Sequence, residues 1–119
     1  MASEPMKTCV HTPRAEAIAQ LNDNLRKTGS GGAITVTRGV RLLPSFCPMA
    51  LMRALGAYND FDEHNDPHGE RDFGDLNLFD EDLLWKIDYY DKTLTYGSDD
   101  PADPAKTQRV LTVMLAGEY

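Results

Sequence analysis

The residues best suited to chemistry lie in one stretch, Phe61 to Gly74, which reads FDEHNDPHGERDFG. It contains two of the three histidines of the chain and five carboxylates. Imidazole and carboxylate groups suit Zn, Mn or Fe, and a metal held by them could activate water for hydrolysis or phosphodiester cleavage. Alternate positions of an extended segment point to the same side. The candidate metal ligands that this alternation selects are His64, Asp66, His68 and Glu70.

Two residues are also candidates for catalysis. His68 lies in the same stretch, and Asp88 lies between Ile87 and Tyr89 in a strongly alternating strand pattern. A half-buried carboxylate at that position needs a polar partner, and a raised pKa would make it a general base. An alternating strand more often directs such a residue to solvent. Asp88 therefore has two interpretations, a general base and a surface residue.

The local sequence favours a structural role for the first stretch. Its spacing matches no standard metal-binding motif. Residues 66–69, Asp-Pro-His-Gly, fit a type I turn, and a turn there disrupts a simple alternating face. Asp66 would then bond the backbone amides of its own turn, and Glu70 and Asp72 would pair with cations such as Arg71. We therefore expect no cofactor and keep a divalent metal ion as the alternative.

Charge is unevenly placed along the chain, whose formal net charge is −7. Residues 1–57 carry seven Lys and Arg against three Asp and Glu, whereas residues 58–104 carry three against fifteen, a balance of −12. The second range predicts a protein partner with a basic surface and no direct nucleic-acid binding, because it repels phosphates. A region that only keeps the protein soluble is the alternative. The acidic residues expected to form the binding surface are Asp60, Asp62, Glu63, Asp66, Glu70, Asp72, Asp75, Asp80, Glu81 and Asp82.

Size and composition predict one domain. At 119 residues, with 41% hydrophobic residues, the chain is expected to fold as a single α+β domain over residues 12–119 behind a flexible leader at residues 1–11. The two cysteines, Cys9 and Cys47, predict no disulfide framework and favour a reducing compartment. No apolar run is long enough to span a membrane, and the N-terminus lacks an apolar signal core. We therefore expect a cytoplasmic protein without a membrane partner.

The first half of the chain predicts two helices and a strand. Residues 13–28 have helical periodicity and are followed by Gly29, a common end of helices. Residues 33–38 alternate as a strand, whose apolar face continues beyond a bulge at Gly39. Residues 48–55 predict a short helix. On one side of it lie Met49, Met52 and Leu55, a set that can mark an adaptable groove but is more often core.

The second half predicts a meander and a closing helix. Residues 73–78, 83–90 and 93–96 have strand patterns. Residues 104–116 are predicted to be a helix with an apolar stripe, preceded by a good N-cap residue. The order αβαβββα predicts an α+β fold, an antiparallel sheet of about four strands with helices packed on one face. An open edge strand would allow a homodimer or pairing with a partner.

Several motifs resemble a bacterial family, domain-of-unknown-function family 3768. They are NDPHGERDFG, WKIDYYD, LND at residues 21–23, TRGV at residues 37–40 and the C-terminal GSDDPADPAKTQRVLTVMLAGEY, so the resemblance extends over residues 14–119. The resemblance implies no established activity and no assigned catalytic residue. It implies similarity to small accessory proteins of chromosomes, plasmids and mobile elements. Where the family often has a histidine, this chain has Arg71, which removes a third histidine from the metal interpretation.

Two functions follow from these observations. The first is a non-enzymatic interaction module whose acidic surface docks onto a basic protein that handles nucleic acid. Together with the resemblance, this favours a mobile-element-borne inhibitor of anti-CRISPR or antirestriction type. The alternative is a metal-dependent hydrolase or nuclease that uses the His, Asp and Glu residues at 64–72. We expect the first.

Overall fold

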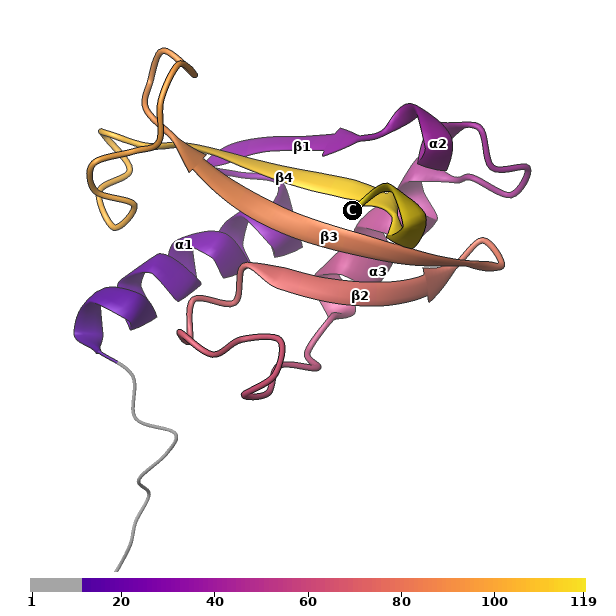
Figure 1. Cartoon of the computed structure of the whole chain (residues 1–119), viewed down its shortest axis with the longest axis horizontal. Helices are drawn as coiled ribbons and strands as arrows, with labels where there is room; N and C mark the ends of the chain where they lie inside the picture. Colours follow the sequence, from indigo (N-terminus) through magenta and orange to yellow (C-terminus); the bar gives the residue numbers. More distant parts are fainter. Residues whose placement is uncertain (1–11) are drawn as a thin grey trace, which may run out of the picture.

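The computed structural model describes residues 12–119, which form a four-stranded sheet with helices (Figure 1). The expected leader, residues 1–11, with Cys9, lies outside the described residues. The elements follow one another as α1 (Pro13–Thr28), β1 (Gly32–Val36), α2 (Arg38–Arg41), α3 (Pro48–Ala57), β2 (Phe73–Leu78), β3 (Glu81–Tyr90), β4 (Gln108–Leu115) and the 3-10 helix η2 (Ala116–Glu118). No helix within these residues is both long and apolar enough to cross a membrane.

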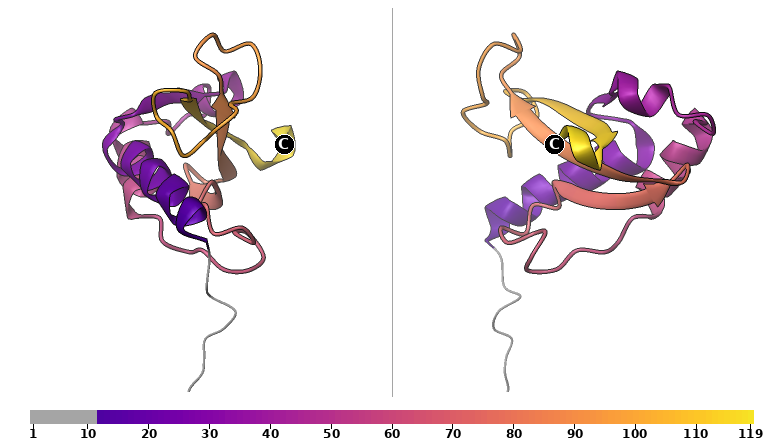
Figure 2. Two further views of the ribbon diagram at one scale, coloured as in Figure 1. Left: turned by 90° about the vertical axis from the view of Figure 1, so that its left-hand side faces the viewer. Right: turned by 45° about the vertical axis from the view of Figure 1, so that its right-hand side comes forward.

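The sheet has the strand order β1-β4-β3-β2. β1 runs parallel to β4, and the other two pairs are antiparallel. The predicted α+β class with four strands is confirmed, but the sheet is mixed, because β1 lies beside the last strand of the chain. Helices α1 and α3 cover one face of the sheet, and η2 lies on the other side (Figure 2, left).

The hydrophobic core lies between the sheet and the two longer helices. Its centre is Trp85 of β3, which is fully buried and meets Tyr58 edge-on, with ring centroids 5.4 Å apart. Gly74 of β2 allows this packing, because a Cβ there would lie 2.6 Å from Trp85 Nε1 and from the Tyr58 ring. The buried cluster comprises Leu25, Val40, Leu51, Leu55, Tyr58, Leu83, Trp85, Ile87, Leu111 and Val113.

The first helix forms as its sequence predicts. Thr12 Oγ1 accepts a hydrogen bond from Ala15 N at 3.0 Å, and Gly29 ends the helix in the left-handed conformation at φ 78°. The buried side of α1 carries two polar residues, Asn22 and Arg26, among its apolar ones. These two side chains connect the helix to the loop and strands described below.

The bulge predicted at Gly39 is wrong. Thr37 Oγ1 instead accepts from Val40 N at 3.5 Å and begins the short helix α2, which buries Val40 completely. An N-cap hydroxyl at this position offers the backbone a helical turn in place of a continued strand. Leu42, which a strand continued beyond Gly39 would place on the apolar face, is 68% exposed. The second predicted helix is confirmed as α3 and continues to Ala57.

The closing helix predicted over residues 104–116 is also wrong, because residues 108–115 form β4 between β1 and β3. Leu111 faces the core, whereas its neighbours Val110 and Met114 lie on the opposite face of the sheet. The β-branched residues Val110, Thr112 and Val113 favour a strand, and two neighbouring strands satisfy its backbone on both sides.

The strand predicted at residues 93–96 does not form. Asp91 Oδ1 accepts hydrogen bonds from the backbone of Thr93 at 3.1 Å and of Thr95 at 3.0 Å, which gives a turn. An aspartate that bonds the next backbone amides competes with strand pairing in this way. The hydroxyl of Thr93 and these amides lower the pKa of Asp91. Only the single bridge between Tyr90 and Gly97 remains.

Candidate functional site

The candidate site is the acidic loop, residues 58–72, which connects α3 to β2 and passes below β2 in Figure 1. It contains no helix or strand, yet side chains fix its backbone. Asp62 Oδ1 accepts from His64 N at 2.8 Å and from Asn65 N at 3.1 Å, and Asp66 N donates to Asp62 O at 2.8 Å. The amides of Asn65 and His64 lower the pKa of Asp62. These bonds make an ordered turn in the middle of the loop.

Tyr58 attaches the loop to β2. Its hydroxyl accepts from Asn65 Nδ2 at 3.2 Å and from Asp75 N at 3.4 Å, and it donates to Asp60 O at 3.1 Å. The ring packs edge-on against Phe61 as well as Trp85. Burial raises the pKa of the Tyr58 hydroxyl. The start of the acidic loop is therefore anchored in the core.

The predicted turn at residues 66–69 is confirmed by the hydrogen bond from Gly69 N to Asp66 O at 3.2 Å. Asp66 Oδ1 accepts from Arg71 N at 2.9 Å, beyond the turn, and the residue is only 9% exposed. Arg71 has a left-handed backbone at φ 54°. Its guanidinium points to α1 and pairs with Asp23 at 2.8 Å and Glu16 at 3.4 Å. The predicted pairing of Arg71 with Glu70 and Asp72 is not present.

A polar network lies between α1, the end of the acidic loop, and strands β3 and β4. Asn22 Nδ2 donates to the Tyr89 hydroxyl at 2.8 Å and to Glu70 O at 3.0 Å, and its Oδ1 accepts from Arg109 Nε at 2.9 Å. The Tyr89 hydroxyl donates to Glu70 Oε1 at 2.9 Å. Arg109 also donates to Pro101 O and lies over the Tyr89 ring, 5.2 Å from its centroid. Burial raises the pKa of Tyr89 and lowers that of Arg109.

A second buried cation supports the start of the loop. Arg26 of α1 is 1% exposed, and its Nη1 donates to Leu55 O at 2.8 Å and to Tyr58 O at 2.9 Å. These carbonyls lie at the end of α3, where helical carbonyls lack intrahelical partners. Arg26 Nη2 pairs with Asp23 at 3.0 Å, so the buried charge has a partner. The guanidinium also lies over the Phe61 ring, 5.4 Å from its centroid.

Asp72 has the most perturbed carboxyl of the site. Burial, followed by the nearby charge of Glu70, raises its pKa from 3.8 to about 6. Asp66 adds to this effect and His68 opposes it. The backbone of Asp72 extends the pairing of β2 with β3, since its carbonyl accepts from Ile87 N at 2.8 Å. Asp72 is therefore held at the edge of the sheet with its carboxyl partly buried. Within residues 12–119 this carboxyl has no ion pair.

The four candidate metal ligands do not gather at one point. His64 and His68 are exposed, Asp66 is turned inward to the Arg71 amide, and Glu70 is bonded to Tyr89. Across the described part of the chain, no group of three or more His, Cys, Asp and Glu side chains is arranged to hold a metal ion.

Asp88, the second catalytic candidate, lies on the sheet face opposite the core, because Trp85 and Ile87 of the same strand face the core. Its carboxylate is 34% exposed and pairs with Lys86 Nζ of the same strand at 2.9 Å. The Asp88 carboxylate raises the pKa of Lys86. The neighbouring Ile87 bonds Asp72 at the end of the acidic loop, but within residues 12–119 no hydrogen bond or ion pair joins Asp88 to His68.

The ten predicted binding residues separate into three groups. Asp66, Glu70 and Asp72 are buried or half-buried within the fold, whereas Asp60, Asp62, Glu63 and the neighbouring Asp75 are exposed at the acidic loop. A third group occupies the hairpin that joins β2 to β3. The six-residue strand β2 separates this hairpin from the acidic loop by about 17 Å. This last group is Asp80, Glu81 and Asp82.

Sequence reasoning missed the buried polar residues that hold the loop. Asn22 and Arg26 lie on the same side of α1 as Ile18 and Leu25, and a polar residue within an apolar helical stripe is a signal that could have found them. Arg109 gives no such signal, because it lies in residues 104–116, for which the sequence predicts a helix. In the strand its side chain alternates onto the core face, level with Tyr89.

A family model described as "Protein of unknown function (DUF3768)" matches residues 36–118, a range that includes the acidic loop and leaves out α1. No curated protein matches the chain, and no solved structure matches it.

Proposed function

We propose a function for this chain, which belongs to the DUF3768 family of proteins of unknown function: it is a small non-enzymatic interaction module. In this proposal, the acidic loop binds a basic surface of another protein. The exposed carboxylates of Asp60, Asp62 and Glu63 make the contact.

The observation that supports this proposal most directly is the fixed backbone of the acidic loop. Asp62, Asn65 and Tyr58 bond its amides and carbonyls, and Arg71 attaches its end to α1. An irregular loop that is already ordered loses less conformational entropy when it binds. The ordered loop also leaves the carboxylates of Asp60, Asp62 and Glu63 exposed, where a partner can reach them.

Charge supports the same interpretation. Residues 58–104 carry fifteen carboxylates against three cations. Such a surface attracts a basic partner over distances of about 10 Å at an ionic strength of about 0.1 M and raises the association rate. The partner class that fits best is a protein whose basic surface binds nucleic acid, because carboxylates can occupy positions that phosphates otherwise take. An inhibitor of anti-CRISPR or antirestriction type is the most specific form of this proposal.

The test begins with a pull-down of tagged protein from its native host and continues with the affinity of the recovered complex. We expect the affinity to fall steeply as salt is raised from about 50 to about 300 mM. Duplex DNA is expected to compete with the chain for the partner. A complex that is indifferent to salt and to DNA would overturn the proposal.

Two double variants with the same change in charge localise the contact. Asp60→Asn with Glu63→Gln removes two exposed carboxylates of the acidic loop, whereas Asp80→Asn with Glu81→Gln removes two at the hairpin. The first is expected to weaken binding about ten-fold and the second less than about two-fold. Equal losses would show that only net charge matters and that the acidic loop is not the contact.

A further inference from the structure

The outer edge of β1 is free. β1 ends the strand order, and no other strand of residues 12–119 pairs with its outer side, as its position at the upper margin of the sheet in Figure 1 shows. Thr37 N donates to Val113 O at 3.0 Å, so Thr37 faces β4. Because backbone groups alternate along a strand, the N–H and C=O groups of Ile34 and Val36 point away from β4. They can pair with another strand.

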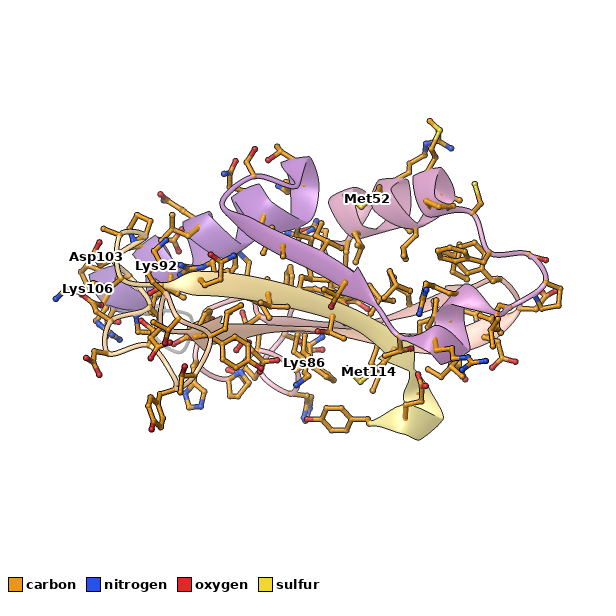
Figure 3. All side chains as sticks on the ribbon, turned by 90° about the horizontal axis from the view of Figure 1, so that it is seen from above. Met52, Lys86, Lys92, Asp103, Lys106 and Met114 are labelled. Atoms are coloured by element: carbon orange, nitrogen blue, oxygen red, sulfur yellow. The ribbon has the colours of Figure 1, made fainter. Side chains whose placement is uncertain are left out.

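An apolar pocket of about 370 Å³ opens beside this edge, between β1 and α3. Figure 3 looks down on β1 and labels Met52 on α3 next to it. The core role predicted for the methionine pair is confirmed for Met52, which packs against the core and also lines the pocket, and is wrong for Met49, which is 72% exposed. The pocket is lined by Gly29, Ile34, Val36, Phe46, Pro48, Leu51 and Met52.

The segments that line the pocket are basic, although the carboxylate of Glu118 lies against Thr37 and Gly39. No Asp or Glu occurs between Asp23 and Asp60 in the sequence. The exposed cations of this range lie beside the pocket-lining segments, and none has an ion pair within residues 12–119. They are Lys27 near the end of α1, Arg38 and Arg41 of α2, and Arg53 of α3.

We propose that this edge binds an extended, acidic segment of a partner protein, which adds to the sheet as a strand beside β1. The backbone of the segment pairs with Ile34 and Val36, and one of its apolar side chains enters the pocket. Addition of a strand to a sheet edge gives affinity through main-chain hydrogen bonds and specificity through pockets for alternate side chains. Acidic residues in the segment complement the four exposed cations.

This site is separate from the acidic loop and has the opposite charge. β1 and the acidic loop lie at opposite margins of the molecule in Figure 1. A second copy of the chain is a less suitable occupant of the edge, because its own β1, Gly32–Val36, carries no acidic residue to complement the four cations. The two proposals therefore stand on different residues and fail independently.

Synthetic peptides test the pairing directly. The probe is a fluorescent ten-residue peptide in which Glu alternates with Val around one central Phe, and its counterpart has Lys in place of Glu. We expect saturable binding of the Glu peptide, measured by anisotropy, with amide shifts in Gly32–Val36, and at least ten-fold weaker binding of the Lys peptide. N-methylation at one set of alternate peptide residues should abolish binding, and at the other set should not, because a strand pairs through one edge.

Variants of the chain test the basic surroundings. Arg41→Glu with Arg53→Glu is expected to weaken the Glu peptide at least ten-fold. The matched control, Lys92→Glu with Lys106→Glu, changes the charge equally at the far end of the molecule, where Figure 3 labels both lysines, and should change affinity less than about two-fold. Melting temperatures of both variants show whether they fold.

Several results would overturn the proposal. They are no binding of the Glu peptide at about 1 mM, equal binding of the Glu and Lys peptides, equal effects of the two N-methylation patterns, and equal effects of the two charge variants. A dimer of the free protein with protected Gly32–Val36 amides would also overturn it, since a second copy would then occupy the edge.

Discussion

Arg71 in the acidic loop holds both carboxylate oxygens of Asp23 on α1, with Nε 3.1 Å from each oxygen and Nη2 2.8 Å from Oδ2. The same carboxylate pairs with Arg26, whose other nitrogen binds the Tyr58 carbonyl at the beginning of the loop. One aspartate of α1 therefore connects to both ends of the acidic loop. The geometry of the loop depends on this helix.

Replacing Arg71 with alanine should release the end of the acidic loop. Amide exchange in residues 59–72 is expected to accelerate, and the free energy of unfolding should fall by about 1 kcal/mol, because the pair is partly exposed. Arg71→Lys should recover little, since lysine cannot bind both oxygens in the fork geometry. Hydrogen exchange with mass spectrometry measures the change, and Lys92→Ala serves as the control for loss of a cation. Unchanged exchange in the loop would contradict the role given to Arg71.

Replacing Asn22 with leucine should destabilise the whole protein. Asn22 has no exposed surface and bonds Glu70, Tyr89 and Arg109 together, so its loss leaves buried polar groups without partners. The expected cost is about 2–4 kcal/mol, measured by urea unfolding. Asn24→Leu, on the exposed side of the same helix, should cost less than about 0.5 kcal/mol. Equal costs at the two positions would show that the network contributes nothing specific.

Replacing Asp72 with asparagine should stabilise the protein at neutral pH. The pKa of Asp72 is raised to about 6 in the folded protein, above the 3.8 of an ordinary aspartate. Between these values the folded state keeps a proton that the unfolded state has released, so stability falls as pH rises through this window. The full penalty applies above about pH 6.

Asp72→Asn removes this penalty and should gain about 1–2 kcal/mol at pH 7.5, with little gain at pH 4, after allowance for solvent screening. Urea unfolding at both pH values measures the difference. The control is Asp99→Asn, which removes an exposed carboxylate and should change the free energy of unfolding by less than about 0.5 kcal/mol. A loss of stability at pH 7.5 in the Asp72 variant would contradict the assigned cause of the shift.

Replacing Gly74 with alanine should disturb the centre of the core. The added methyl group would lie 2.6 Å from Trp85 Nε1 and from the Tyr58 ring, so these side chains must move. The expected cost is about 2–3 kcal/mol, with a shift in tryptophan emission. Gly117→Ala is the control, because nothing lies within 4 Å of its added Cβ. A variant with unchanged stability and emission would show that Trp85 and Tyr58 repack without cost.

Replacing Asp80 with glycine should stabilise the hairpin between β2 and β3. Its two-residue turn, Phe79 and Asp80, has φ values of 59° and 60°, and glycine accepts this left-handed conformation more readily. The expected gain is about 0.5–1 kcal/mol, or a rise in melting temperature of about 2–6 °C. Asp80→Ala removes the same charge but keeps the Cβ, and should give no gain. A gain shared by both variants would point to charge as the cause.

The sequence determined those elements whose signals are local. The caps of α1, the apolar faces of α1 and α3, and the alternating pattern of β3 were sufficient to place these elements, because capping and periodicity act over a few residues. The turn at residues 66–69 was also local, since Asp, Pro and Gly each suit their own position in it. The uneven charge was visible without any structure.

Only the tertiary structure decided whether residues 108–115 form a helix or a strand. Their apolar residues fit a helix and a strand, and the choice depended on β1 and β3, which bind the backbone of β4 from both sides. The same pairing turns the Arg109 side chain to the core face. There it donates a hydrogen bond to Asn22, which lies 87 positions away in the sequence. Such long-range contacts also hold the acidic loop. They decide which of its carboxylates lie at the surface and which lie in the interior. No short-range pattern encodes these contacts, because each depends on elements that meet only after the chain has folded.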